Sequence, residues 1–301
     1  MASGFLLIVV TGICWAGLAG VMAAGMFFHA HASKIQAYSA LLLLGCCGWC
    51  AIIFGGTVPS HKIWLQLCCL VAAGAFNYYM LNLVQLAMNS GKKGVIWAFA
   101  QSSMIWPFLM GICCFREPAA PSRFAGIVLI VFGLILFARE KDNSGDKGRW
   151  LLPTIGAFML SGLAQCCSSI PSYFQITSMS ALRRMMLVQC GILCSFFLDS
   201  LIHHRLDLPK IHTEKAIWLL AGIFGGLNLI ALIFFYNGMN RLADAKCASA
   251  GYPVAQGLGV ILFFLYGCGK KAPSLLSFCG FLLILAGIAA LALSCIAFRS
   301  C

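Results

Sequence analysis

The segment GAFNYYMLNLVQLAMN at residues 74–89 returns in altered form as GGLNLIALIFFYNGMN at residues 225–240. Gly74 matches Gly225 and Asn77 matches Asn228, and the Met-Asn pair that ends each segment matches too, at one constant offset without a gap. Both segments are apolar apart from a few polar side chains. The chain therefore carries an asparagine-bearing hydrophobic segment twice, half a chain apart.

The composition indicates that these segments lie in a membrane. Of the 301 residues, 61% are hydrophobic and only 9% are charged, with a mean hydropathy of +0.95. A soluble domain carries about 25% charged residues, so this chain could not cover a globular surface with polar groups. A helix needs about 20 apolar residues to cross a bilayer. Runs of that kind recur at about 5–28, 36–56, 63–87, 94–115, 122–138, 150–170, 185–203, 216–237, 246–267 and 274–298. We therefore predict an all-α integral membrane protein with ten transmembrane helices in the lipid bilayer, and no large extramembrane module.

The charges and cysteines do not point to nucleic acid or metal. The net charge is +12, but the 20 Lys and Arg residues are scattered over the loops, as is usual beside anionic lipid headgroups. Most of the 17 cysteines lie inside apolar runs, where they act as small hydrophobic residues. We predict no metal site, no cofactor and no nucleic-acid partner.

Further matches extend the repeat along the chain. GICWAGLA at 12–19 resembles GAFMLSGLA at 156–164, and Gly126 and Gly133 share their spacing with Gly280 and Gly287. Spans 1, 3 and 5 thus resemble spans 6, 8 and 10, which predicts two five-helix repeats at residues 1–140 and 149–301, joined by a polar segment at 141–148. Because five is odd, the second repeat must enter the membrane from the opposite side. Such inverted repeats let a site at their interface open to each side in turn; a duplication kept only for packing is the alternative.

Polar side chains form a stripe on each repeated segment. Successive residues of a helix are about 100° apart, so five polar side chains of the third span fall on one helical face. They are Asn77, Tyr78, Asn82, Gln85 and Asn89. Asn228, Tyr236 and Asn240 occupy the places of Asn77, Gln85 and Asn89 in the second segment. Amides in hydrocarbon are costly unless paired, so these faces are expected to border a central cavity. Hydrogen bonding between helices is the other interpretation.

Other polar or aromatic residues within spans could join this lining. The full set of predicted substrate-binding residues is Trp15, Asn77, Tyr78, Asn82, Gln85, Gln101, Trp106, Gln165, Asn228, Tyr236, Tyr252 and Gln256. No acid lies at mid-span, and Glu117 and Asp199 near span ends are the candidates for coupling or gating. Pro107 and Pro253 remove backbone donors and suit kinks or hinges. We predict no catalytic residue.

The segment AFAQSSMIWPFLMGICCFREPAAPSRFAGIVLIVFGLILFA at 98–138 carries a proline (Pro107), a following glutamate (Glu117) and spaced glycines (Gly126, Gly133). It resembles the end of an EamA-type repeat of the drug/metabolite transporter (DMT) superfamily. GYPVAQGLGVILFFLYGCGKKAPSLLSFCGFLLILAGIAAL at 251–291 resembles the same pattern, with Lys270–Lys271 where a glutamate normally stands. The resemblance implies ten helices in two inverted halves in the cell (inner) membrane, with both termini in the cytoplasm. Loop charges alone leave the orientation open.

These observations predict a secondary-active transporter of a small polar metabolite, an amino acid or related compound, working by alternating access around a central cavity. A sugar or nucleotide-sugar transporter is the alternative within transport, and a non-transporting membrane scaffold is the alternative outside it. An enzyme is not expected, since the sequence has no HExxH, no GxSxG and no acidic cluster. The expected partners are a small-molecule substrate and lipid, with either a monomer or a homodimer possible.

Overall fold

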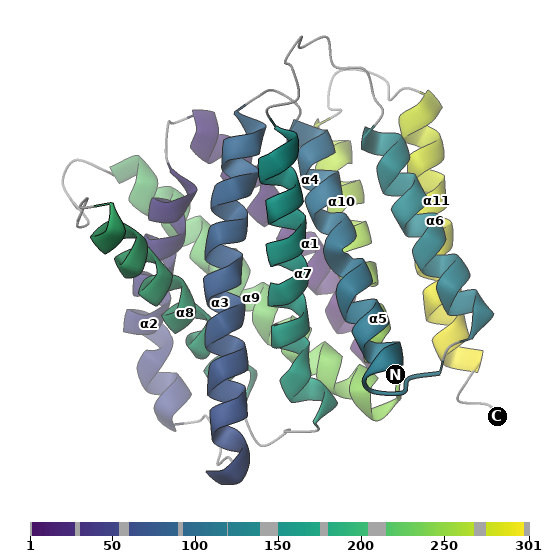
Figure 1. Cartoon of the computed structure of the whole chain (residues 1–301), viewed down its shortest axis with the longest axis horizontal. Helices are drawn as coiled ribbons and strands as arrows, with labels where there is room; N and C mark the ends of the chain where they lie inside the picture. The colour runs from purple at the N-terminus through teal and green to yellow at the C-terminus, as the bar shows by residue number, and fades with distance from the viewer. Residues whose placement is uncertain are drawn as a thin grey trace.

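The computed structural model describes residues 2–27, 31–53, 60–89, 93–118, 120–138, 150–174, 180–203, 215–267 and 275–297. Regular structure in these residues is entirely helical, which confirms the all-α prediction (Figure 1). The α-helices are α1 (Ala2–Phe27), α2 (Ala32–Ile53), α3 (Ser60–Met88), α4 (Lys93–Gln101), α5 (Ile105–Cys113), α6 (Pro121–Ala138), α7 (Leu151–Tyr173), α8 (Ala181–Ile202), α9 (Lys215–Asp244), α10 (Gly251–Gly267) and α11 (Leu275–Ala297). Two 3₁₀ turns, η1 (Ser102–Met104) and η2 (Ala248–Ala250), precede α5 and α10.

The helical segments follow the ten apolar runs of the sequence. Two runs differ from a single uninterrupted helix: the run at 94–115 forms α4, η1 and α5, and the run at 246–267 forms η2 and α10. α9 also continues to Asp244, beyond the expected end at 237. The predicted joint at 141–148 and Lys270–Lys271 lie outside the described residues.

Seven helical stretches in the described part of the chain are long and apolar enough to cross a membrane. They are Ala2–Gly25, Trp64–Met88, Ile96–Cys113, Leu151–Tyr173, Ala181–Ile202, Lys215–Asp244 and Phe278–Cys295, with shorter apolar helices at Pro121–Leu136 and Ala248–Phe263. The outside of the bundle is apolar: Leu152 and Leu275 are each 80% exposed. Amides, hydroxyls and two arginines are buried inside. Apolar surface around a polar interior is the arrangement of a helical membrane protein.

The interruption between α4 and α5 follows from Pro107. Proline has no backbone N–H for the carbonyl group four residues earlier, and its ring crowds that carbonyl. The carbonyl in question belongs to Ser103, in the middle of η1. The tighter 3₁₀ turn is a common way to relieve such a mismatch. The kink predicted at Pro107 is therefore present as a local change of helix type.

The helices pack in pairs that recur between the two halves of the chain. α3 packs on α7 and α8, α9 packs on α1 and α2, α2 packs on α8, and α6 packs on α11. Glycines permit the closest approaches. A Cβ added at Gly133 would lie 2.7 Å from the carbonyl oxygen of Gly280, and one at Gly287 would lie 2.6 Å from that of Gly126. The two glycine pairs found by spacing thus face each other across α6 and α11, which run in opposite directions.

Candidate binding cavity

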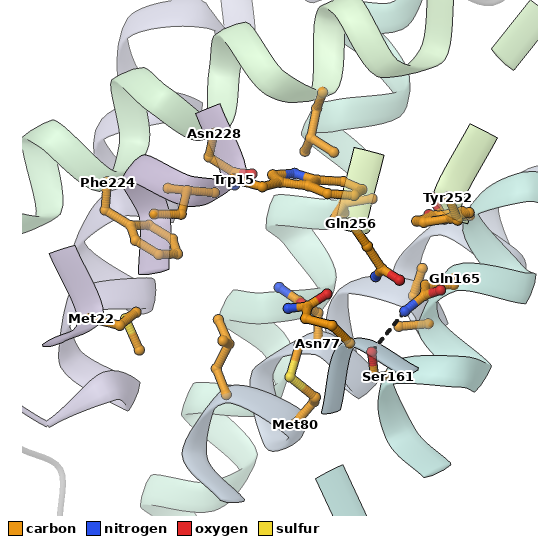
Figure 2. A pocket seen from close by; sticks show the side chains of 18 of the residues that line it. Trp15, Met22, Asn77, Met80, Ser161, Gln165, Phe224, Asn228, Tyr252 and Gln256 are labelled. Carbon is orange, nitrogen blue, oxygen red and sulfur yellow. Dashed lines mark hydrogen bonds between the residues drawn. The ribbon is translucent and has the colours of Figure 1, made fainter. Parts of the chain in front are cut away.

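A cavity of about 140 Å³ lies inside the bundle, between α1, α3, α4, α7, α8, α9 and α10 (Figure 2). Its lining combines aromatic rings, apolar side chains, and amide and hydroxyl groups. The described residues that border it are Trp15, Leu18, Met22, Ala73, Asn77, Met80, Leu81, Trp97, Gln101, Ser161, Ala164, Gln165, Ser168, Val188, Phe224, Asn228, Leu232, Tyr236, Tyr252 and Gln256. None of these side chains carries a formal charge at neutral pH.

The two repeated asparagines both border this cavity. Asn77 comes from α3 and Asn228 from α9, and Figure 2 shows them entering from different sides of the pocket. The structure brings together eight of the twelve residues that the sequence singled out, namely Trp15, Asn77, Gln101, Gln165, Asn228, Tyr236, Tyr252 and Gln256. Their common feature is a polar or aromatic side chain within a predicted span.

The remaining four predicted residues are not among the described residues that line the cavity. Tyr78 is fully buried and donates its hydroxyl hydrogen to Asp199 on α8. Gln85 accepts a hydrogen bond at 2.6 Å from the backbone N–H of Ala32, at the start of α2. Asn82 is half-buried on α3, and Trp106 on α5 is 39% exposed. Tyr78, Asn82 and Gln85 lie on the flank of the α3 stripe, which faces neighbouring helices, whereas Trp106 lies on α5.

A hydroxyl network fixes the orientation of one cavity amide. The Gln165 Nε2 group donates to the hydroxyl oxygens of Ser103 and Ser161, at 2.7 and 2.8 Å. Ser103 in turn donates to Ser161 at 2.7 Å. The Gln165 amide nitrogen is thus held against the serine pair, and its Oε1 makes no hydrogen bond with a described residue. The sequence carried a signal for one of these serines, because Ser161, Gln165, Ser168 and Ser172 recur at helical spacing on α7. Ser103 has no such pattern around it.

Aromatic rings form the wall beside the amides. The Trp15 ring stacks on Tyr252 with centroids 5.8 Å apart, and Phe235 packs against both rings. Aromatic pairs at such separations add about 0.5–1.5 kcal/mol beyond the area that they bury. α1, α9 and α10 are therefore held together along this wall of the cavity.

A buried arginine lies behind the cavity wall. Arg184, near the start of α8, is fully buried and donates to the Ser172 hydroxyl at 2.9 Å and to Asn240 Oδ1 at 3.0 Å. Its guanidinium group lies 5.7 Å from the ring centre of Tyr236, which lines the cavity. Arg184 directly precedes the apolar run at 185–203, a position at which an arginine is usually interfacial. Asn240, the repeat partner of Asn89, is therefore a partner of this arginine and does not line the cavity.

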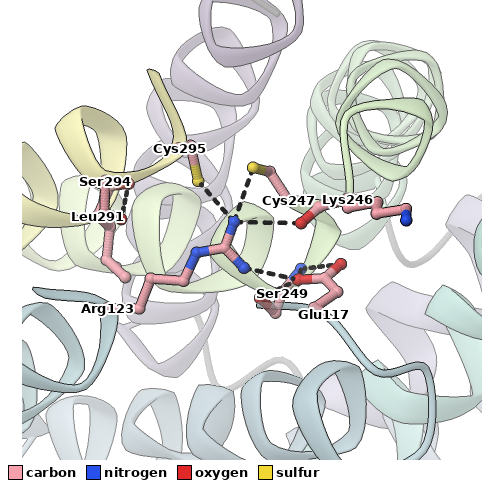
Figure 3. Close-up of polar contacts among 8 residues, drawn as sticks. All are labelled: Glu117, Arg123, Lys246, Cys247, Ser249, Leu291, Ser294 and Cys295. Atoms are coloured by element: carbon pink, nitrogen blue, oxygen red, sulfur yellow. Dashed lines mark hydrogen bonds and ion pairs between the residues drawn. The ribbon is translucent and has the colours of Figure 1, made fainter. Parts of the chain in front are cut away.

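Glu117, a candidate for coupling or gating, forms a buried ion pair with Arg123 at 3.3 Å (Figure 3). Its carboxylate also accepts hydrogen bonds from the backbone N–H of Ser249 at 3.2 Å and from the Ser249 hydroxyl. Arg123 donates to the carbonyl oxygen of Lys246 at 3.1 Å and lies 2.8 Å from the sulfur of Cys247. The cluster joins the α5–α6 connection and α6 to the turn between α9 and α10.

Two left-handed residues shape the turns that supply this cluster. Arg116 and Lys246 adopt φ angles of 53° and 54°, a region that side-chain-bearing residues enter at a cost. Each directly precedes a member of the cluster, Glu117 or Cys247.

The other predicted gating residues occupy helix ends or helix interiors. Asp199 accepts from Tyr78 at 3.1 Å and lies 3.1 Å from His203 Nδ1, on a partly exposed end of α8. Pro107 is buried in α5. Pro253 is buried in the first turn of α10, where the missing N–H costs no helical hydrogen bond. In the described residues, no group of three or more His, Cys, Asp or Glu side chains could hold a metal ion.

Comparisons with known proteins identify the fold but not a family. No family model and no curated protein matches this chain. Among solved structures, 28 chains match. One of them, described only as a crystal structure of a protein, aligns with a TM-score of 0.67 at 16% sequence identity, covering 99% of each chain. The chain therefore shares its fold over its whole length with a solved structure.

Proposed function

We propose that this protein is a secondary-active transporter of a small polar metabolite, with a DMT-like fold of ten spans in two inverted five-helix repeats. The cargo binds in the central cavity, which is exposed to the two sides of the membrane in turn. The observation that carries the proposal is the meeting of Asn77 and Asn228, from equivalent repeated segments, in one uncharged polar cavity.

The pairing of helices supports the two-repeat arrangement. Numbering the spans in order, α3 with α7 is the third with the sixth, and α9 with α1 is the eighth with the first. The contact of α3 with α8 likewise corresponds to that of α9 with α2. In each case the second pair is obtained from the first by replacing every span with its counterpart in the other half, five spans along the chain. The antiparallel glycine contacts of α6 with α11 fit a two-fold axis in the membrane plane.

The distribution of buried charge supports access from one side at a time. The Glu117–Arg123 pair and Arg184 both lie where α5, α7 and α9 end and where α6, α8 and α10 begin. In Figure 1 this is also the end at which α1 begins. Buried charge-assisted hydrogen bonds between helix ends hold those ends together. With both termini in the cytoplasm of a cell (inner) membrane, as proposed, these contacts close the cytoplasmic side.

Counterflow tests the proposal. Purified protein in liposomes loaded with separate pools of unlabelled amino acids, sugars or nucleotide sugars should accumulate the matching labelled compound, and Asn77→Leu or Asn228→Leu should reduce that accumulation at least tenfold. Asn89→Leu is the matched control, because Asn89 is exposed at the end of the same repeated segment. Normal counterflow by both folded cavity variants would show that the cavity does not bind the cargo.

A further inference from the structure

Two glutamine oxygens at the cavity have no hydrogen-bond donor among the described residues. They are Oε1 of Gln165, on α7, and Oε1 of Gln256, on α10. The two residues are only 5% and 6% exposed, yet both border the cavity, and Figure 2 shows both side chains reaching into it. A buried acceptor without a partner is unfavourable by about 1–3 kcal/mol. Both side chains border the cavity, so a ligand that enters it can supply the missing donor once the amide turns toward it.

The enclosed atoms on these two glutamines that lack a partner in the described part of the chain are both acceptors. The Gln165 amide nitrogen already lies against Ser103 and Ser161, so its carbonyl oxygen is the group that lacks a partner within the described ranges. Sugar hydroxyls both donate and accept, and amides that bind them commonly offer both kinds of group. An ammonium group has three donors and no acceptor. Two free carbonyl oxygens therefore match an ammonium group better than a hydroxyl.

Aromatic rings next to the glutamines favour positive charge. A small recess of about 10 Å³ opens beside Gln256, between the rings of Trp15 and Trp97 and the amide of Gln101. Indole faces attract cations, most strongly where water is excluded. A recess of this size is near the minimum for one water-sized group, so an ammonium nitrogen is closer to its size than a trimethylated nitrogen.

We propose that the cavity binds its cargo by a primary ammonium group, held by the carbonyl oxygens of Gln165 and Gln256 against the ring of Trp15. This inference rests on the proposed function, in that it names the chemical class of the cargo. The cargo is a primary amine, and a compound with a hydroxyl group in place of the amine binds weakly. Compounds without an amine, including simple sugars, are poor ligands.

Three probes with the same aromatic ring and near-identical length test this class. Equilibrium binding of labelled tyramine to the purified full-length protein is measured, with competition by tyrosol, in which a hydroxyl replaces the amine, and by 4-hydroxyphenylacetate. Tyramine should bind at least tenfold more tightly than either. Gln165→Leu and Gln256→Leu should each weaken tyramine at least fivefold and leave tyrosol unchanged. Gln165→Glu should strengthen tyramine, because it places a carboxylate beside the ammonium group.

Asn89→Leu is the matched control, since it also replaces an amide by leucine, at an exposed position that does not line the cavity. Its tyramine affinity should equal that of the wild type, and thermal unfolding should show that every variant is folded. The inference is overturned if tyramine does not bind, if tyrosol binds as tightly, or if the preference persists in the double glutamine variant. Glutamine-dependent tyramine binding without counterflow of any amine would support this inference and remove the proposed transport. Counterflow of a sugar by a protein indifferent to tyramine would overturn the inference and leave transport standing.

Discussion

Replacement of Glu117 by glutamine isolates the contribution of the buried ion pair to stability. The side chains of Arg123 and Glu117 are 0% and 3% exposed, so water cannot replace a lost partner. In Glu117→Gln, Arg123 keeps the Lys246 carbonyl oxygen but loses its counter-ion, and its guanidinium group cannot shed its charge. Removing one partner of a buried ion pair costs about 3–5 kcal/mol. The temperature of unfolding should therefore fall by roughly 6–15 °C.

Removing the arginine of the pair, in Arg123→Met, should destabilise the protein less than Glu117→Gln does. In Arg123→Met, the Glu117 carboxylate keeps both donors of Ser249 and can also take up a proton. The double variant should be more stable than Glu117→Gln alone, because no buried charge then lacks its partner. Thermal unfolding in detergent, followed by circular dichroism at 222 nm, measures all three. Arg241→Met is the control, since Arg241 is exposed on α9, and it should behave as the wild type. A change of less than about 2 °C for Glu117→Gln, or additive effects in the double variant, would refute the reasoning.

Three further predictions concern packing, the cavity and the second arginine. Gly74→Ala should strongly destabilise the protein, because its Cβ would overlap a backbone oxygen of α8. Gly20→Ala has open space around it and should be neutral or stabilising by up to about 1 kcal/mol. Thermal unfolding compares the two variants. Ala164→Phe should fill part of the cavity and abolish ligand binding while leaving the unfolding temperature near that of the wild type, as binding and melting measurements will show. Asn240→Ala removes an acceptor from a buried guanidinium and should cost about 1–3 kcal/mol, whereas Asn89→Ala, at the equivalent but exposed position, should cost little in the same melting assay.

The sequence predicted the helices and two residues of the cavity, because apolar runs and an internal repeat are both visible along the chain. Apolar runs of bilayer length locate the helices, and the repeat singled out Asn77 and Asn228, which share the cavity. The flank of the stripe was less predictable. Tyr78 lies about 100° around α3 from Asn77 and contacts Asp199 on α8. The sequence of α3 alone does not show which neighbouring helix covers each part of its surface.

The buried charges could not be predicted in the same way. Arg123 and Arg184 stand at the edges of apolar runs, where an arginine usually reaches the interface. Their burial depends on partners far along the chain: Arg123 meets the turn before α10, and Arg184 meets Asn240 at the end of α9. Only the folded arrangement brings those groups within reach. Glu117 directly follows Arg116 in the sequence, yet its ion-pair partner in the structure is Arg123.

Trans-stimulation tests most directly the central claim, that one cavity serves both sides of the membrane in turn. Proteoliposomes loaded with a labelled cargo found by counterflow are diluted into buffer with or without the same unlabelled compound, and efflux of label is followed. Alternating access predicts faster efflux with cargo outside, since the loaded cavity returns more readily than the empty one, and predicts loss of this acceleration in Asn228→Leu. Efflux that is unaffected or slowed by external cargo, or identical to that of empty liposomes, would contradict the account.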